Sequence, residues 1–457
     1  MIESLISIAF CLSSLLTLII LLLPSQYEPS KKAKGGNGTP RPTVQILVLG
    51  DIGRSPRMQY HALSVARKGG KVDIIGYQES DPHPEILTDP NITIVPLRPH
   101  PPFLQTSNKI LFILYGPLKV LFQVAYLWKC LAYTTAPAQW MIVQNPPSIP
   151  TLVVASVSCF LRHTRLIIDW HNFGYSILAL KLGRNHPLVK VSTWYERTFA
   201  QSASVHFCVT DAMGSVLKDQ FNLRAPILTL HDRPANHFHP IQDPGERKKF
   251  LVTLPGAEPL RELLESGGAE VLVSSTSWTP DEDFSVLIEA LQQYSEQTEN
   301  EPCLPHILAV ITGKGPQKEM YMRQIAALEA EGKLKKVTIR TAWLTVQDYA
   351  QLLASASLGV SLHTSSSGVD LPMKVVDMFG AGLPVVGWNR FKAWPELVTE
   401  GVNGMGFGSA AELTDQLVTF FKYPQQLNRL RTGAQMESGR RWEDEWDPIA
   451  GTLLGLT

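Results

Sequence analysis

Short apolar runs alternate with polar or amphipathic stretches along most of the chain. Continuous apolar runs of about five residues are typical of strands buried on both faces of a parallel sheet. One series predicts strands at residues 43–49, 72–76, 92–96, 140–144, 166–168, 205–210 and 227–230. A second series predicts strands at residues 269–274, 306–312, 337–340, 358–362 and 383–386. Because stretches of helical length separate these runs, the pattern predicts an α/β chain with two doubly wound, Rossmann-like domains.

The same pattern sets the expected domain boundaries. At 457 residues the chain is long enough for two domains with separate cores. Residues 43–235 form the expected N-terminal domain and residues 269–410 the expected C-terminal domain. Residues 236–268, rich in proline, glutamate, lysine and glycine, are expected to form a linker that contains an irregular piece of helix. Residues 411–457 predict crossover helices that pack across both domains.

The N-terminal stretch has the pattern of a membrane anchor. Residues 5–23 form an uncharged run that is long enough to cross a bilayer. Residues 24–42 form an expected flexible linker with several lysines, which places the following chain in the cytosol and residues 1–4 in a lumen. A cleaved signal peptide is the alternative. The anchor is favoured because Glu3, and no basic residue, precedes the apolar run.

A second hydrophobic segment, residues 103–133, interrupts the strand–helix rhythm. It is rich in leucine and aromatic residues, and its only charges are lysines at intervals of ten. Pro117 is expected to divide it into two helices, each too short to span a bilayer. Core helices are one interpretation. The aromatic residues and the lysine spacing favour a segment that associates with the membrane surface.

Composition excludes several classes of function. Lysine plus arginine and aspartate plus glutamate number 41 each, so no overall field favours nucleic acid. The five cysteines are scattered without a CxxC pair, which argues against a disulfide framework and a zinc site. The sequence 281–283, Asp-Glu-Asp, is interpreted as a helix cap, so no tightly bound metal is expected. A contribution from Mg²⁺ in solution is left open.

The stretch from residue 358 to 386 has the pattern of a phosphate site. A buried strand opens into a serine-rich loop, and a helix is expected to begin near Asp370. Free N–H groups at a helix N-terminus bind phosphate, and Lys374 in the first turn opposes the helix dipole unless an anion is bound there. Asp377 lies seven residues after Asp370, which places both carboxylates on one helical face. A lysine between glycines at 313–315 is a further candidate for a diphosphate. The candidates are Lys314, Gly315, His363, Ser365, Ser366, Ser367, Gly368, Asp370, Lys374 and Asp377.

The first domain offers a candidate general base. Asp169 and His171 follow the strand at 166–168, and ligands of open α/β sheets bind beyond the carboxyl ends of strands. An imidazole oriented by a carboxylate can act as a general base, and a purely structural pair beneath a loop is the alternative. A glycine-containing loop follows the first strand and supplies candidate phosphate or acceptor ligands. These are Gly50, Asp51, Gly53, Arg54 and Arg57.

Several of these motifs together resemble a known family. Residues 50–58 (GDIGRSPRM), 169–175 (DWHNFGY), 274–284, 312–316 (TGKGP) and 361–386 are similar to the family of chitobiosyldiphosphodolichol beta-mannosyltransferases, and the similarity extends over about residues 43–450. The resemblance implies a GT-B glycosyltransferase whose two domains face a cleft. It also implies a single-pass protein of the endoplasmic reticulum membrane with cytosolic catalytic domains.

The resemblance further implies GDP-mannose as donor and dolichyl-diphosphate di-N-acetylchitobiose as acceptor, joined in a β-1,4 linkage with inversion. His171 or Asp169 is then the expected base, while Lys314 and Lys374 neutralise the departing GDP in place of a metal. Asp377 aligns with an acid expected near the donor ribose. The resemblance to GT-B transferases also implies a Glu-x7-Glu motif, and Asp370, with six residues between it and Asp377, fits the first acid of that motif poorly. Other mannosyltransferases of lipid-linked oligosaccharide assembly are candidate partners.

Two other functions agree with the same sequence features. A retaining GT-B transferase acting on another lipid acceptor shares the fold and differs in its base and in its product. A non-catalytic, membrane-tethered subunit of a glycosyltransferase complex keeps the fold without the chemistry. Mannose transfer from GDP-mannose by the purified protein separates these interpretations.

Overall fold

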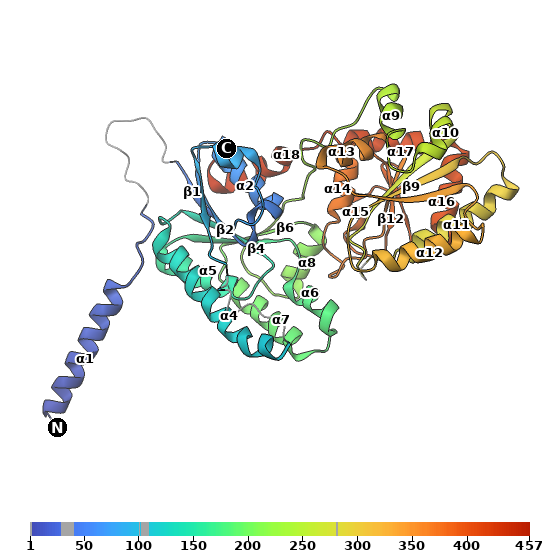
Figure 1. Cartoon of the computed structure of the whole chain (residues 1–457). Helices are drawn as coiled ribbons and strands as arrows, with labels where there is room; N and C mark the ends of the chain where they lie inside the picture. Colours follow the sequence, from blue (N-terminus) through green and yellow to red (C-terminus); the bar gives the residue numbers. More distant parts are fainter. Residues whose placement is uncertain (1, 29–40, 100, 102–108, 280–281) are drawn as a thin grey trace. The chain divides into compact units, whose positions relative to one another are not determined.

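The computed structural model describes residues 2–28, 41–99, 101, 109–279 and 282–457. The chain divides into two compact units. Unit 1 consists of Met1–Cys208, Val216–Leu228 and Trp446–Thr457, and unit 2 consists of Val209–Ser215 and Thr229–Glu445. Each unit is built on its own parallel sheet with helices on both faces (Figure 1). The expected α/β architecture with two Rossmann-like sheets is confirmed.

The sheet of unit 1 has seven strands in the order β3-β2-β1-β4-β5-β6-β7. They are β1 (Thr43–Asp51), β2 (Lys71–Tyr77), β3 (Ile92–Pro96), β4 (Trp140–Asn145), β5 (Arg165–Trp170), β6 (Val205–Cys208) and β7 (Ile227–Thr229). All seven were expected from the apolar runs. Ile46 on β1 pairs with Ile74 on β2 and Ile142 on β4, and all three side chains are buried. The strand order reverses between β1 and β4, which makes this the topological switch point.

The sheet of unit 2 has six strands in the order β10-β9-β8-β11-β12-β13. They are β8 (Ala269–Ser275), β9 (His306–Thr312), β10 (Val337–Ala342), β11 (Leu358–Ser361), β12 (Val385–Trp388) and β13 (Gly404–Phe407). The first five were expected. The sixth, β13, was missed because two of its four residues are glycine, so it shows no apolar run. It pairs with β12 at the sheet edge.

Two buried clusters cover the two faces of the second sheet. On β9, Ile307 and Ile311 belong to one cluster, while Leu308 and Val310 belong to the other. This alternation follows from the two-residue period of a strand, and a strand buried on both faces therefore reads as a continuous apolar run. The residues packed on each face come from different sets of helices, as expected for a doubly wound domain.

Most helices lie in the segments between strands. Before β8 these are α1 (Ile2–Leu21), α2 (Pro56–Arg67), α3 (Pro84–Thr88), α4 (Lys109–Lys129), α5 (Thr151–Arg162), α6 (Gly174–Leu182), α7 (Pro187–Ala200), α8 (Asp211–Asp219), α9 (Pro244–Leu251) and α10 (Arg261–Ser266). After β8 they are α11 (Ser285–Asn300), α12 (Lys318–Ala330), α13 (Val346–Ser355), α14 (Met373–Gly380), α15 (Trp394–Leu397), α16 (Ala410–Lys422), α17 (Pro424–Glu437), α18 (Trp442–Trp446) and α19 (Thr452–Leu454).

The hydrophobic segment expected at 103–133 differs from the prediction. Its first residues, 103–108, lie outside the described residues, and the rest is one helix, α4, with Pro117 inside it. The division into two helices was therefore wrong. Proline removes one main-chain hydrogen bond and bends a helix, and the bonds on either side of Pro117 keep this 21-residue helix continuous. The last residues, Cys130–Thr134, form a turn of π-helix.

The region expected to link the domains is structured. Residues 236–268 contain α9 and α10, and their buried leucines, Leu251 and Leu264, join one of the two clusters of unit 2. The C-terminal residues divide between the units, since residues up to Glu445 belong to unit 2 and Trp446–Thr457 to unit 1. Trp446 is fully buried in unit 1 and becomes part of the candidate site below.

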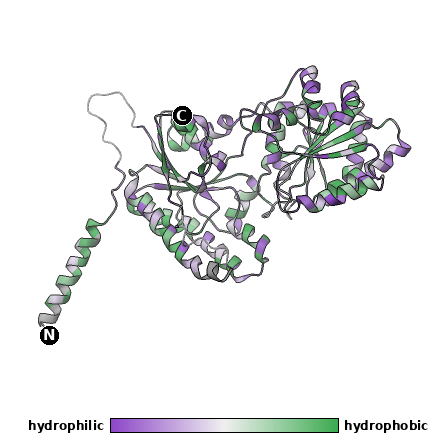
Figure 2. Ribbon diagram, in the orientation of Figure 1, coloured by the Kyte–Doolittle hydropathy of each residue, from purple (hydrophilic) through white to green (hydrophobic). Residues whose placement is uncertain are grey.

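The N-terminal residues form α1, which covers most of the apolar run at 5–23. Apolar residues make up much of α1 and α4 (Figure 2). Within the described ranges, no helix combines the length and the apolar composition needed to cross a membrane. Residues 29–40 of the expected linker lie outside the described residues. The end of the N-terminal segment contacts the residues after α4, where the Tyr133 hydroxyl donates to the carbonyl of Leu22 at 2.7 Å.

Candidate active site

In unit 1, the predicted residues Asp169 and His171 lie beside the switch point. Asp169 is near the carboxyl end of β5, which pairs with β4, and the main-chain N–H of His171 donates to the carbonyl of Asn145 at the end of β4 at 2.9 Å. Ligands of such sheets bind beyond the carboxyl ends of the strands. The position of both residues therefore agrees with the interpretation of a functional site.

Asp169 is fully buried and is held by the side chains of Arg57, His61 and His171. Arg57 on α2 holds it in a bidentate pair, with Nε 2.8 Å from Oδ2 and a terminal nitrogen 2.9 Å from Oδ1. The Nε2 atoms of His61 and His171 lie 3.2 and 3.1 Å from Oδ2. Burial alone raises the pKa of the Asp169 carboxyl, but the Arg57 charge and the two imidazoles hold that pKa well below its usual range. Asp169 is therefore ionised at neutral pH.

His61 connects this carboxylate to the C-terminal segment. The indole N–H of Trp446 donates to His61 Nδ1 at 2.9 Å, so Nδ1 carries no proton and Nε2–H donates to Asp169. Burial lowers the pKa of His61, which keeps the ring neutral in this role. Its ring also stacks on Phe207, with centroids 5.8 Å apart. The only sequence signal for His61 was its spacing from Arg57, four residues earlier on the same helical face.

His171 is the member of the predicted pair that reaches solvent. Its side chain is 25% exposed, whereas that of Asp169 is 0% exposed. Its Nε2 faces Asp169, which leaves Nδ1 as the ring nitrogen that Asp169 does not contact. If Nε2 carries the proton, Nδ1 is a free lone pair. A proton can then be accepted at Nδ1 while the adjacent carboxylate stabilises the positive ring.

The glycine-containing loop after β1 is held by Asp51. The Asp51 carboxylate accepts hydrogen bonds from the main-chain N–H groups of Gly53, Glu79 and Ser80 at 3.3, 3.1 and 3.2 Å. A side chain at Gly53 would lie 2.7 Å from the carbonyl oxygen of Ser80, so this glycine is required by packing between two loops. Arg54 is the exposed cation of the loop, with its side chain 77% exposed and Nε 3.4 Å from Asp51.

Two residues beside that loop, one on β1 and one on α2, differ from their expected use. Arg57, expected to pair with phosphate, is buried and engages Asp169 instead. A side chain at Gly50 would meet only an ordinary contact with Val48 at 3.7 Å, so packing does not require glycine there.

In unit 2, the switch point lies at β8, which is flanked by β9 and β11. The loops after these three strands contain nearly all of the predicted phosphate-binding residues. The loops after β8 and β9 touch through their main chains, since a side chain at Gly313 or Gly315 would lie 1.8 or 1.7 Å from the carbonyl oxygen of Thr276 or Ser277. The two glycines therefore allow the close approach of these loops. Lys314 between them places its Nζ 3.8 Å from the centre of the Trp343 ring.

Lys374 has a carboxylate partner in this structure. It lies in the first turn of α14 and pairs with Glu282, whose side chain is 5% exposed while that of Lys374 is 28% exposed. The other oxygen of Glu282 accepts from the Thr276 hydroxyl at 2.7 Å and the Ser277 N–H at 2.6 Å. The anion expected near Lys374 is therefore supplied by the protein itself. The sequence interpretation missed Glu282 by treating 281–283 as a cap, a role that fits Asp283, which accepts from the N–H of Ser285 at 3.1 Å.

The serine loop after β11 is organised around Asp370. Asp370 lies 3.2 Å from Nε2 of His363 and accepts hydrogen bonds from the hydroxyls of Ser365 and, at 3.3 Å, Ser367. The N–H of Gly368 donates to the Ser365 hydroxyl at 2.6 Å, and Ser365 has the unusual φ of 58°. Ser366 lies in the same loop and is half-buried. These bonds fix the shape of the loop.

The two acids of this stretch do not share a helical face. Asp370 precedes α14, which begins at Met373, while Asp377 is inside that helix. A helix was expected to begin within a few residues of Asp370, and α14 begins at Met373, but Asp370 itself lies outside the helix, so the expected shared face was wrong. Burial and the nearby Asp232 carboxylate raise the pKa of Asp377 to about 7.

Comparison with known proteins places this geometry in a family. The family model "Glycosyl transferases group 1" matches residues 269–422. The chitobiosyldiphosphodolichol beta-mannosyltransferase of Arthroderma benhamiae is 51% identical over 98% of this chain and 97% of its own. The enzyme of that name from Yarrowia lipolytica is 44% identical over 90% of this chain and 86% of its own. The chain belongs to the chitobiosyldiphosphodolichol beta-mannosyltransferase family.

Solved structures support the fold of this mannosyltransferase. Anabaena HepE in complex with UDP-glucose matches with a TM-score of 0.62 at 17% identity, over 91% of this chain and 100% of that one. At this identity the match shows the GT-B fold and nothing about the substrate. The expected GT-B class is confirmed.

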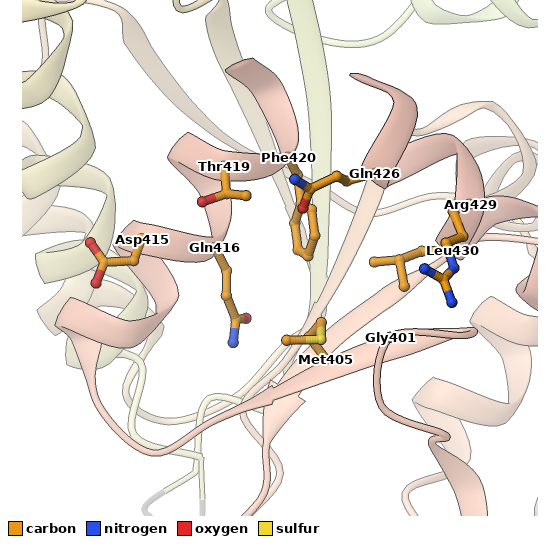
Figure 3. A pocket seen from close by; sticks show the side chains of 9 residues that line it. All are labelled: Gly401, Met405, Asp415, Gln416, Thr419, Phe420, Gln426, Arg429 and Leu430. Atoms are coloured by element: carbon orange, nitrogen blue, oxygen red, sulfur yellow. The ribbon is translucent and has the colours of Figure 1, made fainter. Parts of the chain in front are cut away.

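Two other features of this beta-mannosyltransferase lie apart from the predicted residues. A hollow of about 490 Å³ is lined by residues of β13, α16, α17 and their connections (Figure 3). None of its lining residues belongs to the loops at the switch point of unit 2. In the described part of the chain, the one group with metal-ligand spacing is Asp211, His231 and Glu396, within 4.8 Å. Glu396 already accepts from the N–H groups of Asp211 and Ala212 at 2.6 and 2.7 Å, so it serves α8 as a cap.

Proposed function

We propose that this beta-mannosyltransferase transfers mannose from GDP-mannose to dolichyl-diphosphate di-N-acetylchitobiose, forming a β-1,4 linkage with inversion. The observation that carries the proposal is the identity of 51% over nearly the whole chain with a relative named for chitobiosyldiphosphodolichol and beta-mannosyl transfer. That printed name is the support for the acceptor and the β product. GDP-mannose follows from the motif resemblance of the sequence.

The proposed base is Nδ1 of His171. It takes the proton from the acceptor sugar hydroxyl as that oxygen attacks the anomeric carbon, and the bond to GDP breaks. Asp169 stays ionised and stabilises the imidazolium that forms. Of the two candidate bases, His171 is supported by its partial exposure, while the full burial of Asp169 argues for a positioning role. Arg57 and His61 hold Asp169, and the indole of Trp446 in turn donates to His61.

The proposed donor site is formed by the loops after β8, β9 and β11. Lys374 and Lys314 supply positive charge to the leaving diphosphate, and the serine loop supplies hydroxyl and main-chain donors. Glu282 holds the Lys374 ammonium in place until the more highly charged donor competes for it. Asp377, on the same helix as Lys374, is proposed to lie near the donor ribose.

No tightly held metal takes part in this proposal. The donor-loop acids that the structure describes are engaged by protein groups, since Asp370 binds serine hydroxyls and Glu282 binds Lys374. Transfer measured after treatment with EDTA, and again with added Mg²⁺, tests this part. A complete loss of transfer that Mg²⁺ restores would contradict it.

We also propose that the enzyme acts at the endoplasmic reticulum membrane, as a single-pass protein with its catalytic domains in the cytosol. Residues 5–23 would provide the anchor and α4 a shallow contact, supported by the exposure of Leu118 and Leu121. Confinement near a lipid-borne acceptor raises its effective concentration. Other mannosyltransferases of lipid-linked oligosaccharide assembly are proposed partners. Asn91-Ile92-Thr93 has the pattern of an N-glycosylation acceptor, and a glycan found on Asn91 would contradict the cytosolic placement.

The decisive experiment uses the purified full-length chain in detergent with labelled GDP-mannose and lipid-diphosphate chitobiose. A single mannose, released by a β-mannosidase and not by an α-mannosidase, is the expected product. His171→Ala should abolish transfer, and His239→Ala, at an exposed histidine of unit 2, is the matched control. An α-linked product would favour a retaining transferase. No product from any preparation would favour a non-catalytic subunit.

A further inference from the structure

Helices α6 and α7 of unit 1 expose a group of large apolar side chains. On α6 and its end these are Ile177, Leu180 and Leu182, and on α7 they are Leu188, Val191 and Trp194. Their exposed fractions run from 37% for Ile177 to 61% for Trp194. We call these six residues the α6–α7 apolar surface. Solvent exposure of so many large apolar side chains on one short helical pair marks an interaction surface.

The helical spacing shows that this exposure belongs to one face. On α7, Leu188, Val191 and Trp194 recur every three residues, so they lie along one side of the helix. Val189 and Glu196 lie on the side that is buried in unit 1. Apolar residues of α7 therefore occur on its exposed side as well as on its buried side. The outer row is not needed for the core.

The charges beside this surface have one sign. Residues 171–195 contain no aspartate or glutamate, while Lys181, Arg184 and Lys190 are all exposed. The next acid, Glu196, is fully buried. An apolar segment whose own exposed charges are all cations complements a bilayer with anionic headgroups, because the apolar groups enter the acyl boundary and the cations remain at the phosphates. Tryptophan is the side chain most typical of that boundary.

Neighbouring helices of unit 1 also expose apolar residues. Helix α7 packs on α5, which exposes Val157 and Phe160, and α5 packs on α4, the helix that the sequence already suggested for membrane contact. Phe160 is 80% exposed. Three helices in contact within one unit thus carry exposed apolar residues.

We propose that the α6–α7 apolar surface docks on the anionic surface of the bilayer as a membrane contact separate from α1 and α4. The proposal rests on exposure and charge within unit 1 and holds whichever sugar the enzyme transfers. Docking places α6, which begins at Gly174 three residues after His171, at the lipid surface, where a lipid-borne acceptor diphosphate resides.

The test uses the full chain reconstituted in vesicles, so that α1 and α4 are bound in every sample. Cys11 and Cys303, the exposed cysteines among the described residues, are replaced by serine, and an environment-sensitive fluorophore is attached through Val191→Cys. The matched control carries the label through Met436→Cys, an exposed apolar position of unit 2. In vesicles with anionic lipid, the label at 191 should shift its emission to shorter wavelength and be quenched by lipids brominated in their acyl chains, while the control label should show neither effect.

A charge variant tests the choice of partner. Replacing Lys181, Arg184 and Lys190 by glutamine should abolish the shift and the quenching at position 191. On neutral vesicles, the labelled chain that keeps these three cations should also show neither effect. If the label at 191 stays in water on anionic vesicles, the proposal is wrong. It is also wrong if the label is shielded but the brominated lipids do not quench it, because the surface is then covered by protein. Unchanged mannose transfer in the charge variant leaves the proposed catalytic function intact, so the two proposals fail separately.

Discussion

Arg57 provides the sharpest test of the site in unit 1. The sequence suggested a phosphate ligand, whereas the structure gives its guanidinium two bonds to Asp169, at 2.8 and 2.9 Å. If Arg57 serves Asp169, its replacement should reduce stability and kcat and leave the KM for GDP-mannose nearly unchanged. If it serves phosphate, the KM should rise with little loss of stability.

The magnitude follows from burial. Removing one partner of a buried ion pair costs about 3–5 kcal/mol, because the other charge is left without compensation. Asp169 is 0% exposed, so Arg57→Gln should fall in that range, a large part of a typical total of about 5–15 kcal/mol. Arg57→Lys keeps the charge and loses the bidentate geometry, and should cost about 1.5–3 kcal/mol, as for a hydrogen bond to a charged group.

The assay pairs urea unfolding with steady-state kinetics for both variants. Arg57→Lys is the more informative of the two, because it should stay folded while His171 loses part of its orientation. Arg54→Lys is the matched control, since Arg54 is largely exposed and its replacement should change stability by less than about 1 kcal/mol. A raised KM for GDP-mannose in Arg57→Lys, with unchanged unfolding free energy, would refute the assignment of Arg57 to Asp169.

Three further predictions concern the second unit. The Glu396 and Glu445 carboxylates raise the pKa of His231 to about 9. The stabilisation that this shift contributes, at most about 3 kcal/mol, is therefore complete below about pH 6.5 and is lost as the pH rises to about 9. Urea unfolding should show this loss in the unaltered chain and not in His231→Gln. Burial raises the pKa of Asp377 to about 7, so the folded state binds a proton more tightly than the unfolded state does. The free energy of unfolding should therefore fall as the pH rises from about 4 to about 7. Asp377→Asn should remove that fall in the same measurement. Lys374→Ala should lower kcat by about 10²–10³-fold in the mannose-transfer assay, as for loss of one group that stabilises developing charge.

The sequence predicted the strands well because burial on both faces leaves a continuous apolar run, as in the run that becomes β9. The sequence-based prediction failed where an element does not produce a continuous apolar run or a local pattern. The strand β13 is half glycine, and α4 continues through Pro117. Asp370 lies before α14, where its carboxylate accepts from the Ser367 hydroxyl, so it cannot share a helical face with Asp377.

The site was predicted in part for a related reason. Asp169 and His171 are two residues apart at a strand end, so topology alone places them together. The other contacts join residues far apart in sequence. Arg57 is 112 residues from Asp169, and Trp446 is 385 residues from His61. No local pattern reports such pairs, and an arginine near glycines therefore suggested phosphate when its partner was a buried carboxylate.

The two units position their functional groups by the same physical means. In unit 1 a carboxylate that is 0% exposed holds His171, which is 25% exposed, and in unit 2 a carboxylate that is 5% exposed holds Lys374, which is 28% exposed. A buried carboxylate with several fixed donors has little freedom to move, so it fixes the direction of the group it holds. The exposed partner is then the one that can meet a substrate. Asp169 in unit 1 and Glu282 in unit 2 are therefore best understood as supports, and their mutation should act through the orientation of His171 and Lys374, respectively.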